Sequence, residues 1–250
     1  MDFIFVFILG LVFGSFFNVC IYRIPREESI AYPPSHCTSC GNRLKTVDLF
    51  PVLSYIILGG KCRYCGEKIS IKYPLFEVLT ATIFMLIYKQ YGYSMDTIKY
   101  IVFASYLIVV GIIDLNTTDV YFSTTIFGIV SGSAFLIINI ILRNAFLTYI
   151  YGSAFGVGVI ALIIITTHGM GWGDAEILGI CGLFLGFKLS LLTFFLSTVL
   201  GGIIGIVLIA TKIKSRKDYI PFGPYIAIAA LISVLYGNGM IEWYFQFLNI

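Results

Sequence analysis

Long apolar segments dominate this chain and restrict it to one environment. Hydrophobic residues make up 59% of its 250 residues and charged residues only 12%, about half the charged share of a soluble protein, which is about 25%. A membrane-spanning helix needs roughly 20 mostly apolar residues. Eight segments approach that length: 2–22, 75–93, 97–114, 120–142, 149–168, 175–188, 190–211 and 222–241. The sequence therefore predicts an all-α polytopic membrane protein with about eight transmembrane helices.

The distribution of basic residues predicts the orientation of these helices. Eight Lys and Arg residues fall in 23–74 and four in 212–221, twelve of the sixteen in the chain. Because cytoplasmic loops are enriched in Lys and Arg, we expect both segments in the cytoplasm and the N-terminus outside. Segment 2–22 has no basic n-region before it, so we expect a retained helix rather than a signal peptide. The net charge of +3 is too small to indicate nucleic-acid binding.

The polar segment 23–74 contains two Cys-x-x-Cys-Gly motifs, with 21 residues between the second cysteine of the first motif and the first cysteine of the second. Their cysteines are Cys37, Cys40, Cys62 and Cys65. Four thiolates match a closed tetrahedral zinc site, and so short a segment is marginal for a hydrophobic core of its own. We therefore expect a small cytoplasmic zinc-binding insert between the first and second helices. The alternatives are four unconnected thiols or a redox pair, although no thioredoxin-like βαβ pattern surrounds the motifs.

Carboxylates in or beside membrane helices are costly, so each is a candidate for function. Asp114 ends the predicted third helix and Asp174 begins the sixth, both at the cytoplasmic face of the predicted topology. Two carboxylates at one depth can share a proton, so that one activates water while the other polarises a carbonyl. The alternative is that Asp174 only caps its helix, and that Asp114 and Asp119 do the same on either side of a turn.

The stretch Gly169-Met-Gly-Trp-Gly-Asp174 favours a functional site over a simple helix cap. Its three alternating glycines let the backbone come close to whatever the carboxylate acts upon, which a cap does not require. We therefore expect Gly171 and Gly173 to form a loop next to a substrate.

At this point the sequence resembles a known family. The glycine stretch matches the Gly-x-Gly-Asp signature of membrane aspartyl proteases, and the paired cysteine motifs are similar to those of type IV prepilin peptidases. Further stretches resemble the same family, in its order along the chain: Gly14-Ser-Phe-Phe-Asn-Val-Cys-Ile-Tyr-Arg-Ile-Pro25, Pro51-Val-Leu-Ser-Tyr55, Lys72-Tyr-Pro-Leu-Phe-Glu77 and Ile220-Pro-Phe-Gly-Pro-Tyr225. The resemblance extends over nearly the whole chain.

The resemblance implies a bifunctional enzyme of the bacterial inner membrane. Such an enzyme cleaves the leader of type IV prepilin or pseudopilin precursors after a glycine, on the cytoplasmic side. It then methylates the new N-terminal amine, usually of phenylalanine, with S-adenosylmethionine. By position, Asp114 and Asp174 would be catalytic, and the four cysteines would bind structural zinc. The implied division is a first transmembrane helix (1–22), a methyltransferase-associated insert (23–74) and a peptidase domain (75–250).

Two departures from the family pattern concern the neighbourhood of the aspartates. Tyr121-Phe122 replaces the usual Pro-Asp or Pro-Asn after the first aspartate, and Glu176 replaces a frequent lysine after the second. A transporter is the main alternative, since it also needs carboxylates and broken helices in the membrane. A zinc-dependent hydrolase is a weaker one, because four thiolates leave no open position for water.

Methyl transfer needs a neutral amine close to a sulfonium, and a nearby carboxylate can serve that arrangement. We expect Glu77 in this role, on the first turn of the second helix and facing the insert. The alternative is that Glu77 only complements the helix macrodipole. Arg63 is the candidate to bind the donor's carboxylate, unless it is simply a surface charge.

Overall fold

The computed structural model describes residues 2–143, 145–215, 218 and 220–247. Arg216 and Lys217, two of the basic residues counted above, lie outside the described residues. Within these ranges the chain is helical and contains no β-strand. The α-helices are α1 (Asp2–Arg23), α2 (Leu53–Ile57), α3 (Lys72–Tyr91), α4 (Met95–Thr117), α5 (Phe122–Ile141), α6 (Leu147–Thr167), α7 (Trp172–Ala210) and α8 (Gly223–Phe247). Two 3-10 turns, Ile24–Arg26 and Thr46–Leu49, lie in the insert region.

The predicted all-α membrane fold is confirmed in its main lines. Six helices among the described residues are long and apolar enough to cross a membrane: α1 with the turn after it, α4, α5, α6, α7 and α8. Large apolar side chains such as Ile4, Ile165 and Ile206 stay at least 67% exposed, which suits contact with lipid tails. The protein is therefore a multi-pass membrane protein.

The span count of eight stays a prediction, because three of the expected segments behave differently from the rest. Segment 75–93 forms α3, but this helix begins earlier, at Lys72, and is not among the six apolar spans. Segments 175–188 and 190–211 together form α7, which is interrupted at Gly186 with φ 75° and ψ 174°. The Phe187 N–H, which this break removes from the helix, donates to Thr148 Oγ1 of α6 at 3.2 Å.

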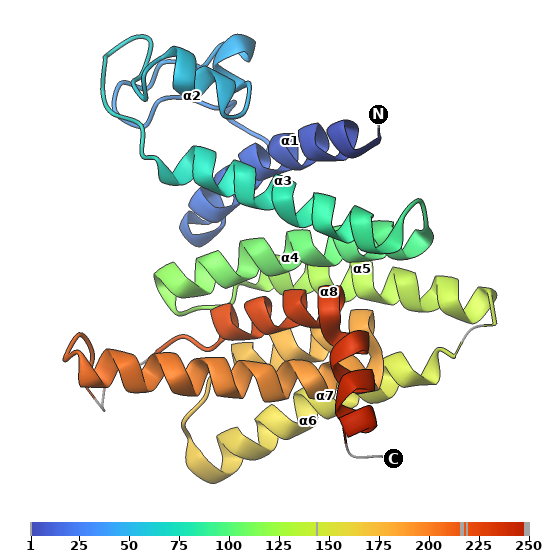
Figure 1. The fold of residues 1–250 in the computed structure, drawn as a ribbon. Coiled ribbons are helices and arrows are strands. Elements are labelled where there is room, and N and C mark those ends of the chain that lie inside the picture. Colours follow the sequence, from blue (N-terminus) through green and yellow to red (C-terminus); the bar gives the residue numbers. More distant parts are fainter. Residues whose placement is uncertain (1, 144, 216–217, 219, 248–250) are drawn as a thin grey trace. The chain divides into compact units, whose positions relative to one another are not determined.

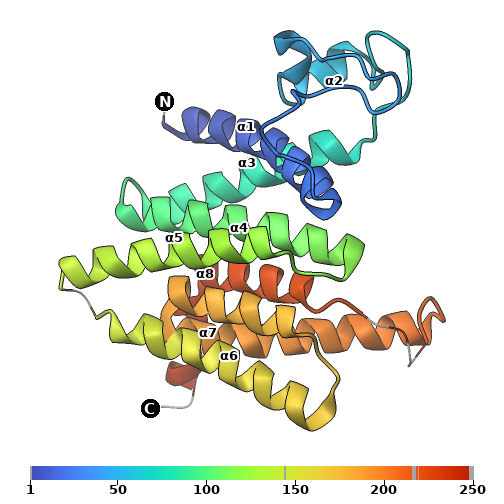
Figure 2. The ribbon, with the colours of Figure 1, turned by 180° about the vertical axis from the view of Figure 1, so that it is seen from behind.

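The chain divides into two compact units, one ending at Thr97 and the other beginning at Ile98. In the first, α1 and α3 lie side by side, with the cysteine-rich insert beyond them (Figures 1 and 2). A Cβ atom at Gly14 of α1 would collide with the backbone of Glu77, so this contact brings the helices unusually close. The division into functional segments at residues 22 and 74 stays a prediction.

In the second unit, α6 and α7 cross with almost no side chain between them. Gly182 of α7 lies directly against the backbone of Gly152 and Ser153. Small residues permit such close approach of membrane helices, whose association depends on packing rather than on the hydrophobic effect.

This crossing gives a first prediction. Gly182→Ala should destabilise the protein by about 1–3 kcal/mol, the usual cost of overpacking, because the new methyl group would collide with the α6 backbone. Thermal unfolding of the detergent-purified protein measures the effect. Gly158→Ala is the matched control, since a Cβ atom there meets no atom of the described part of the chain within 4 Å. Equal melting temperatures for the two variants would contradict the prediction.

Candidate active site and metal centre

Asp174 lies in the first turn of α7 and is only 4% exposed. The helix begins after Gly171, whose N–H donates to Asp174 Oδ2 at 3.2 Å. The capping alternative is thus realised in part: Asp174 does satisfy an N–H at the helix start. A cap on a surface helix would be solvated, however, whereas this carboxylate is buried.

The structure explains why a glycine stands at position 173, one of the three alternating glycines. A Cβ atom at this position would collide with the side chain of Val120, in the connection between α4 and α5. The glycine therefore brings the first turn of α7 directly against the segment that follows Asp114. The expected role of Gly171 and Gly173 beside a substrate stays a prediction.

Asp114 lies in the last turns of α4, which continues to Thr117 rather than ending at the aspartate as expected. Its side chain is 3% exposed, and its Oδ2 accepts a hydrogen bond from the Gly223 N–H at 2.9 Å. Gly223 opens α8, and a Cβ atom there would collide with the Asp114 carboxylate and press on Ile177 of α7. Three helices therefore meet at Asp114.

Gly223 is a site residue that the sequence reasoning missed. It stands in Pro221-Phe-Gly-Pro224, a stretch that the sequence marks only as part of the family resemblance. The signal was present: a glycine between two prolines at a helix start leaves an N–H exposed where no side chain can cover it.

The two buried aspartates interact electrostatically with one another. Asp119 also interacts with Asp114, but its own side chain is exposed on the connection to α5. The fold thus brings together, from α4 and α7, the two carboxylates that the sequence paired.

The two departures from the family pattern are linked in the structure through Thr125. Tyr121 caps α5, accepting the N–H groups of Thr124 and Thr125. Thr125 is buried, and its hydroxyl donates to Glu176 Oε2 at 2.6 Å. Glu176, in the second turn of α7, therefore joins that helix to the first turn of α5.

The four cysteine sulfurs of the two motifs converge, all within 4.8 Å of one another. A tetrahedral zinc ion with Zn–S bonds of about 2.3 Å needs sulfurs about 3.8 Å apart, and Cys37 and Cys65 are at 3.9 Å. The backbone N–H groups of Cys40 and Ser39 lower the pKa of the Cys37 thiol to about 6, which favours the thiolate form that binds metal. These residues fit zinc.

The two motifs also repeat one backbone design. Cys37 N–H donates to the Asn42 carbonyl and Gly41 N–H to the Cys37 carbonyl, and Cys62 makes the same pair of bonds with Glu67 and Gly66. Gly41 and Gly66 both have φ near +70°, a conformation that glycine adopts without steric cost. Each turn therefore presents two sulfurs to the same point.

The first unit also contains a cavity of about 440 Å³, and both predicted donor-binding residues line it. Glu77 is 7% exposed, and its Oε2 accepts the Val52 N–H at 2.7 Å. Because α3 begins at Lys72, Glu77 lies in the second turn and not in the first as expected. It is therefore too far along the helix for the macrodipole alternative, which acts within the first turn.

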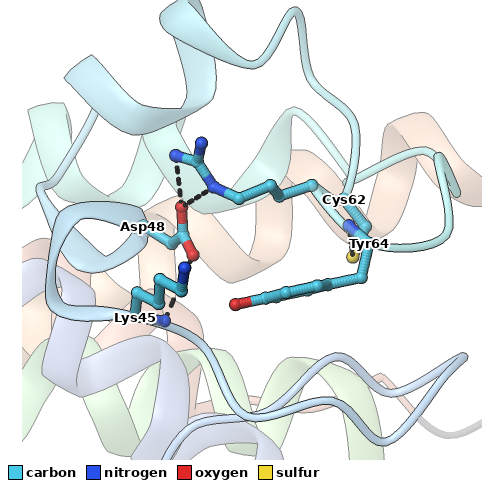
Figure 3. A network of polar contacts seen from close by, with 5 residues as sticks. Lys45, Asp48, Cys62 and Tyr64 are labelled. Carbon is cyan, nitrogen blue, oxygen red and sulfur yellow. Dashed lines mark hydrogen bonds and ion pairs between the residues drawn. The ribbon is translucent and has the colours of Figure 1, made fainter.

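Arg63 is not a solitary surface charge, because Asp48 holds its guanidinium. Asp48 Oδ1 accepts from Arg63 Nε and pairs with Nη2, both at 2.7 Å. Asp48 Oδ2 accepts the Lys45 N–H at 3.1 Å, and Figure 3 shows these two residues side by side. Desolvation alone would raise the pKa of Asp48, but the bonds from Arg63 and Lys45 outweigh it and lower that pKa.

Two family models match the chain, one on each side of the boundary between the two compact units. Residues 8–91 match the family model described as the bacterial peptidase A24 N-terminal domain, and residues 101–206 match the type IV leader peptidase family. No solved structure matches the chain.

Curated relatives match over almost the whole length. A prepilin leader peptidase/N-methyltransferase of Bacillus subtilis is 32% identical over 96% of this chain and 97% of its own. The protein of the same name from Pseudomonas putida is 32% identical over 92% of this chain and 89% of its own. These matches favour the peptidase over the transporter alternative, and the chain belongs to the prepilin leader peptidase/N-methyltransferase family.

Proposed function

We propose that Asp114 and Asp174 form the proteolytic dyad of a membrane aspartic endopeptidase. The observation that carries this proposal is the pairing of two nearly fully buried carboxylates from α4 and α7. Like charges so placed favour sharing one proton between them. The ionised aspartate takes a proton from water as it attacks the scissile carbonyl, while the protonated one donates to the carbonyl oxygen.

The substrates are type IV prepilin or pseudopilin precursors, cleaved on the cytoplasmic side of the bacterial inner membrane. The predicted topology supports this assignment, since the basic loops and both aspartates fall on one side when the N-terminus is outside. Lipid surrounds the helices. The Gly171–Gly173 turn would lie beside the bound leader.

The second activity is methylation of the new N-terminal amine, with S-adenosylmethionine as methyl donor. Glu77 would balance the sulfonium charge and Arg63 would bind the donor's carboxylate, and both line one cavity. Cys37, Cys40, Cys62 and Cys65 would hold a structural zinc ion. Zinc with four thiolates supplies folding stability to the insert and leaves no position for catalysis.

The experiment that tests both activities is mass spectrometry of a pilin precursor co-expressed with this protein. The expected product has lost its leader and gained the mass of one methyl group on the N-terminal residue. A precursor that keeps its leader would contradict the peptidase assignment. A cleaved but unmethylated pilin would contradict the methyltransferase assignment alone.

The Thr125–Glu176 contact gives a prediction for cleavage. Thr125→Val and Glu176→Gln should each lower kcat by about tenfold with little change in KM, because a hydrogen bond to a charged group contributes about 1.5–3 kcal/mol. We expect the loss to appear in kcat because the bond sets how α7 presents Asp174. Steady-state cleavage of a pilin precursor measures both constants.

The double variant separates this coupling from two unrelated effects. If the residues act as one contact, the double variant should be no slower than either single variant. Thr198→Val is the matched control, since among the described residues its hydroxyl bonds only to the carbonyl of Phe194 on its own helix. If kcat of the double variant instead falls by the product of the two single losses, the residues act independently and the prediction is wrong.

A further inference from the structure

Helix α2, in the insert, has its apolar side chains on its outer face. Leu53, Ile56 and Ile57 are 59%, 66% and 78% exposed. Ile56 and Ile57 follow Leu53 by three and four residues, so the three side chains form one stripe along the helix. The opposite face carries Ser54 and Tyr55, which line the cavity of the first unit. A helix that faces water has the reverse arrangement, so the α2 stripe indicates a partner other than water.

Helix α2 is held beside a membrane helix rather than beyond its end (Figures 1 and 2). The Val52 N–H, directly before α2, donates to Glu77 in the second turn of α3. The backbone of Glu77 in turn lies against Gly14 of α1. Gly14 lies about 14 Å along α1 from the end of that helix at Arg23. Because α1 is one of the six apolar spans, α2 begins at a level that the bilayer reaches.

Exposed apolar side chains occur at the same level on both helices beside α2. Leu75, two residues before Glu77, is exposed on α3, and Phe16, two residues after Gly14, is exposed on α1. Lipid covers Phe16 because α1 crosses the membrane. Phe50, shortly before α2, is exposed as well. The α2 stripe therefore lies at a level where lipid already contacts the protein.

The charge of the insert favours an anionic surface. Segment 23–74 contains eight Lys and Arg residues but only four Asp and Glu residues, and one of these acids, Asp48, pairs with Arg63. Lys45 and Lys61, which precede and follow α2 in the chain, are exposed. An apolar stripe accompanied by lysines is typical of a helix that lies in a membrane interface. There the apolar face enters the acyl boundary and the cations meet lipid phosphates.

We propose that the α2 stripe docks the insert into the lipid interface of an anionic membrane leaflet. Leu53, Ile56 and Ile57 contact the acyl chains, and the exposed lysines of the insert contact the headgroups. The partner is thus the lipid itself and not a second protein. This docking gives the insert a third attachment to the membrane, besides α1 and α3, and it does not depend on either activity proposed above.

A tryptophan on the stripe tests what covers it, because bromine atoms on lipid chains quench tryptophan emission only on contact. The full-length protein is reconstituted into phosphatidylglycerol vesicles, with its own Trp172 and Trp243 replaced by phenylalanine. We expect Ile57→Trp to lose at least about half of its emission when the acyl chains are brominated, since the stripe reaches the acyl boundary. Arg43→Trp, at an exposed position after the first cysteine motif, is the matched control and should lose less than about a tenth.

Two further comparisons separate the stripe and the charge from the added ring, since tryptophan itself favours membrane interfaces. Adding Leu53→Ser and Ile56→Ser to the Ile57→Trp protein removes the rest of the stripe and should reduce the quenching at least about twofold. Replacing the lipid with brominated phosphatidylcholine, which has no net charge, should reduce the quenching by about the same factor. All three side chains are exposed, so these substitutions leave no cavity in a packed core.

The outcomes distinguish lipid from the other partners that an apolar stripe could have. Equal quenching at positions 57 and 43, or full quenching without Leu53 and Ile56, would overturn the stripe as the docking surface. Equal quenching in the two lipids would overturn the contact with anionic headgroups. Emission of Ile57→Trp that bromine leaves unchanged would overturn the proposal as a whole. A shift of that emission on addition of a pilin precursor would then assign the stripe to the substrate, and a shift at high protein-to-lipid ratio would assign it to a second copy.

Discussion

Replacing either Asp114 or Asp174 with asparagine is expected to lower the rate of leader cleavage by roughly a thousandfold or more, the scale on which loss of an essential acid–base residue acts. Asparagine keeps the shape of the side chain and still accepts a hydrogen bond, so Gly223 and Gly171 retain their partners. It cannot take a proton from water. The loss should therefore appear in cleavage while the protein stays folded.

The measurement is cleavage of a pilin precursor by purified protein, with thermal unfolding as the test of folding. Asp119→Asn is the matched control, because Asp119 is exposed and acts on Asp114 through its charge. We expect this variant to retain most of its activity. Substantial cleavage by Asp114→Asn would contradict the catalytic role of Asp114. If Asp119→Asn also loses all activity, that role belongs to Asp119.

Removing two of the predicted zinc ligands is expected to unfold the insert. In the double variant Cys37→Ser, Cys40→Ser, only two of the four converging sulfurs remain. A structural zinc ion contributes on the order of 10 kcal/mol to folding, and a segment of this size has little core to replace it. Metal analysis of anaerobically purified protein should find one zinc per unchanged chain and almost none in the variant.

Limited proteolysis measures whether the insert unfolds. Tryptic cleavage within 23–74 should become at least about tenfold faster in the double variant, since unfolding exposes its Lys and Arg residues. Cleavage of pilin leaders should survive, because Asp114 and Asp174 belong to the other compact unit. Cys20→Ala is the control, as Cys20 is buried in α1 away from the cluster. An equally protease-resistant insert in both variants would contradict a structural metal.

The sequence by itself determined the features that depend on local pattern. Apolar segments predict helices because a membrane forces the backbone to form its hydrogen bonds internally, and the structure confirms the all-α membrane fold. The spacing of the cysteines predicted a four-sulfur cluster, since each short turn with glycine brings two sulfurs together and a tetrahedral zinc site takes two such pairs. The buried aspartates stood out because few charges occur in apolar surroundings.

The sequence could not determine contacts between residues far apart in the chain. Gly223 donates to Asp114 across 109 positions, and Thr125 to Glu176 across 51. Nothing in either local pattern names its partner, because such pairs depend on which helix faces pack together. The same holds for Val52 and Glu77.

The break in α7 shows the difference most clearly. The sequence placed a boundary near Lys188 because a charge interrupts an apolar run there. The helix instead breaks at Gly186, where α6 comes close enough for Thr148 to satisfy the Phe187 N–H. A helix in a membrane can lose a backbone hydrogen bond only where a neighbour replaces it. The apolar pattern thus decided that helices form, and the tertiary packing decided where this one breaks.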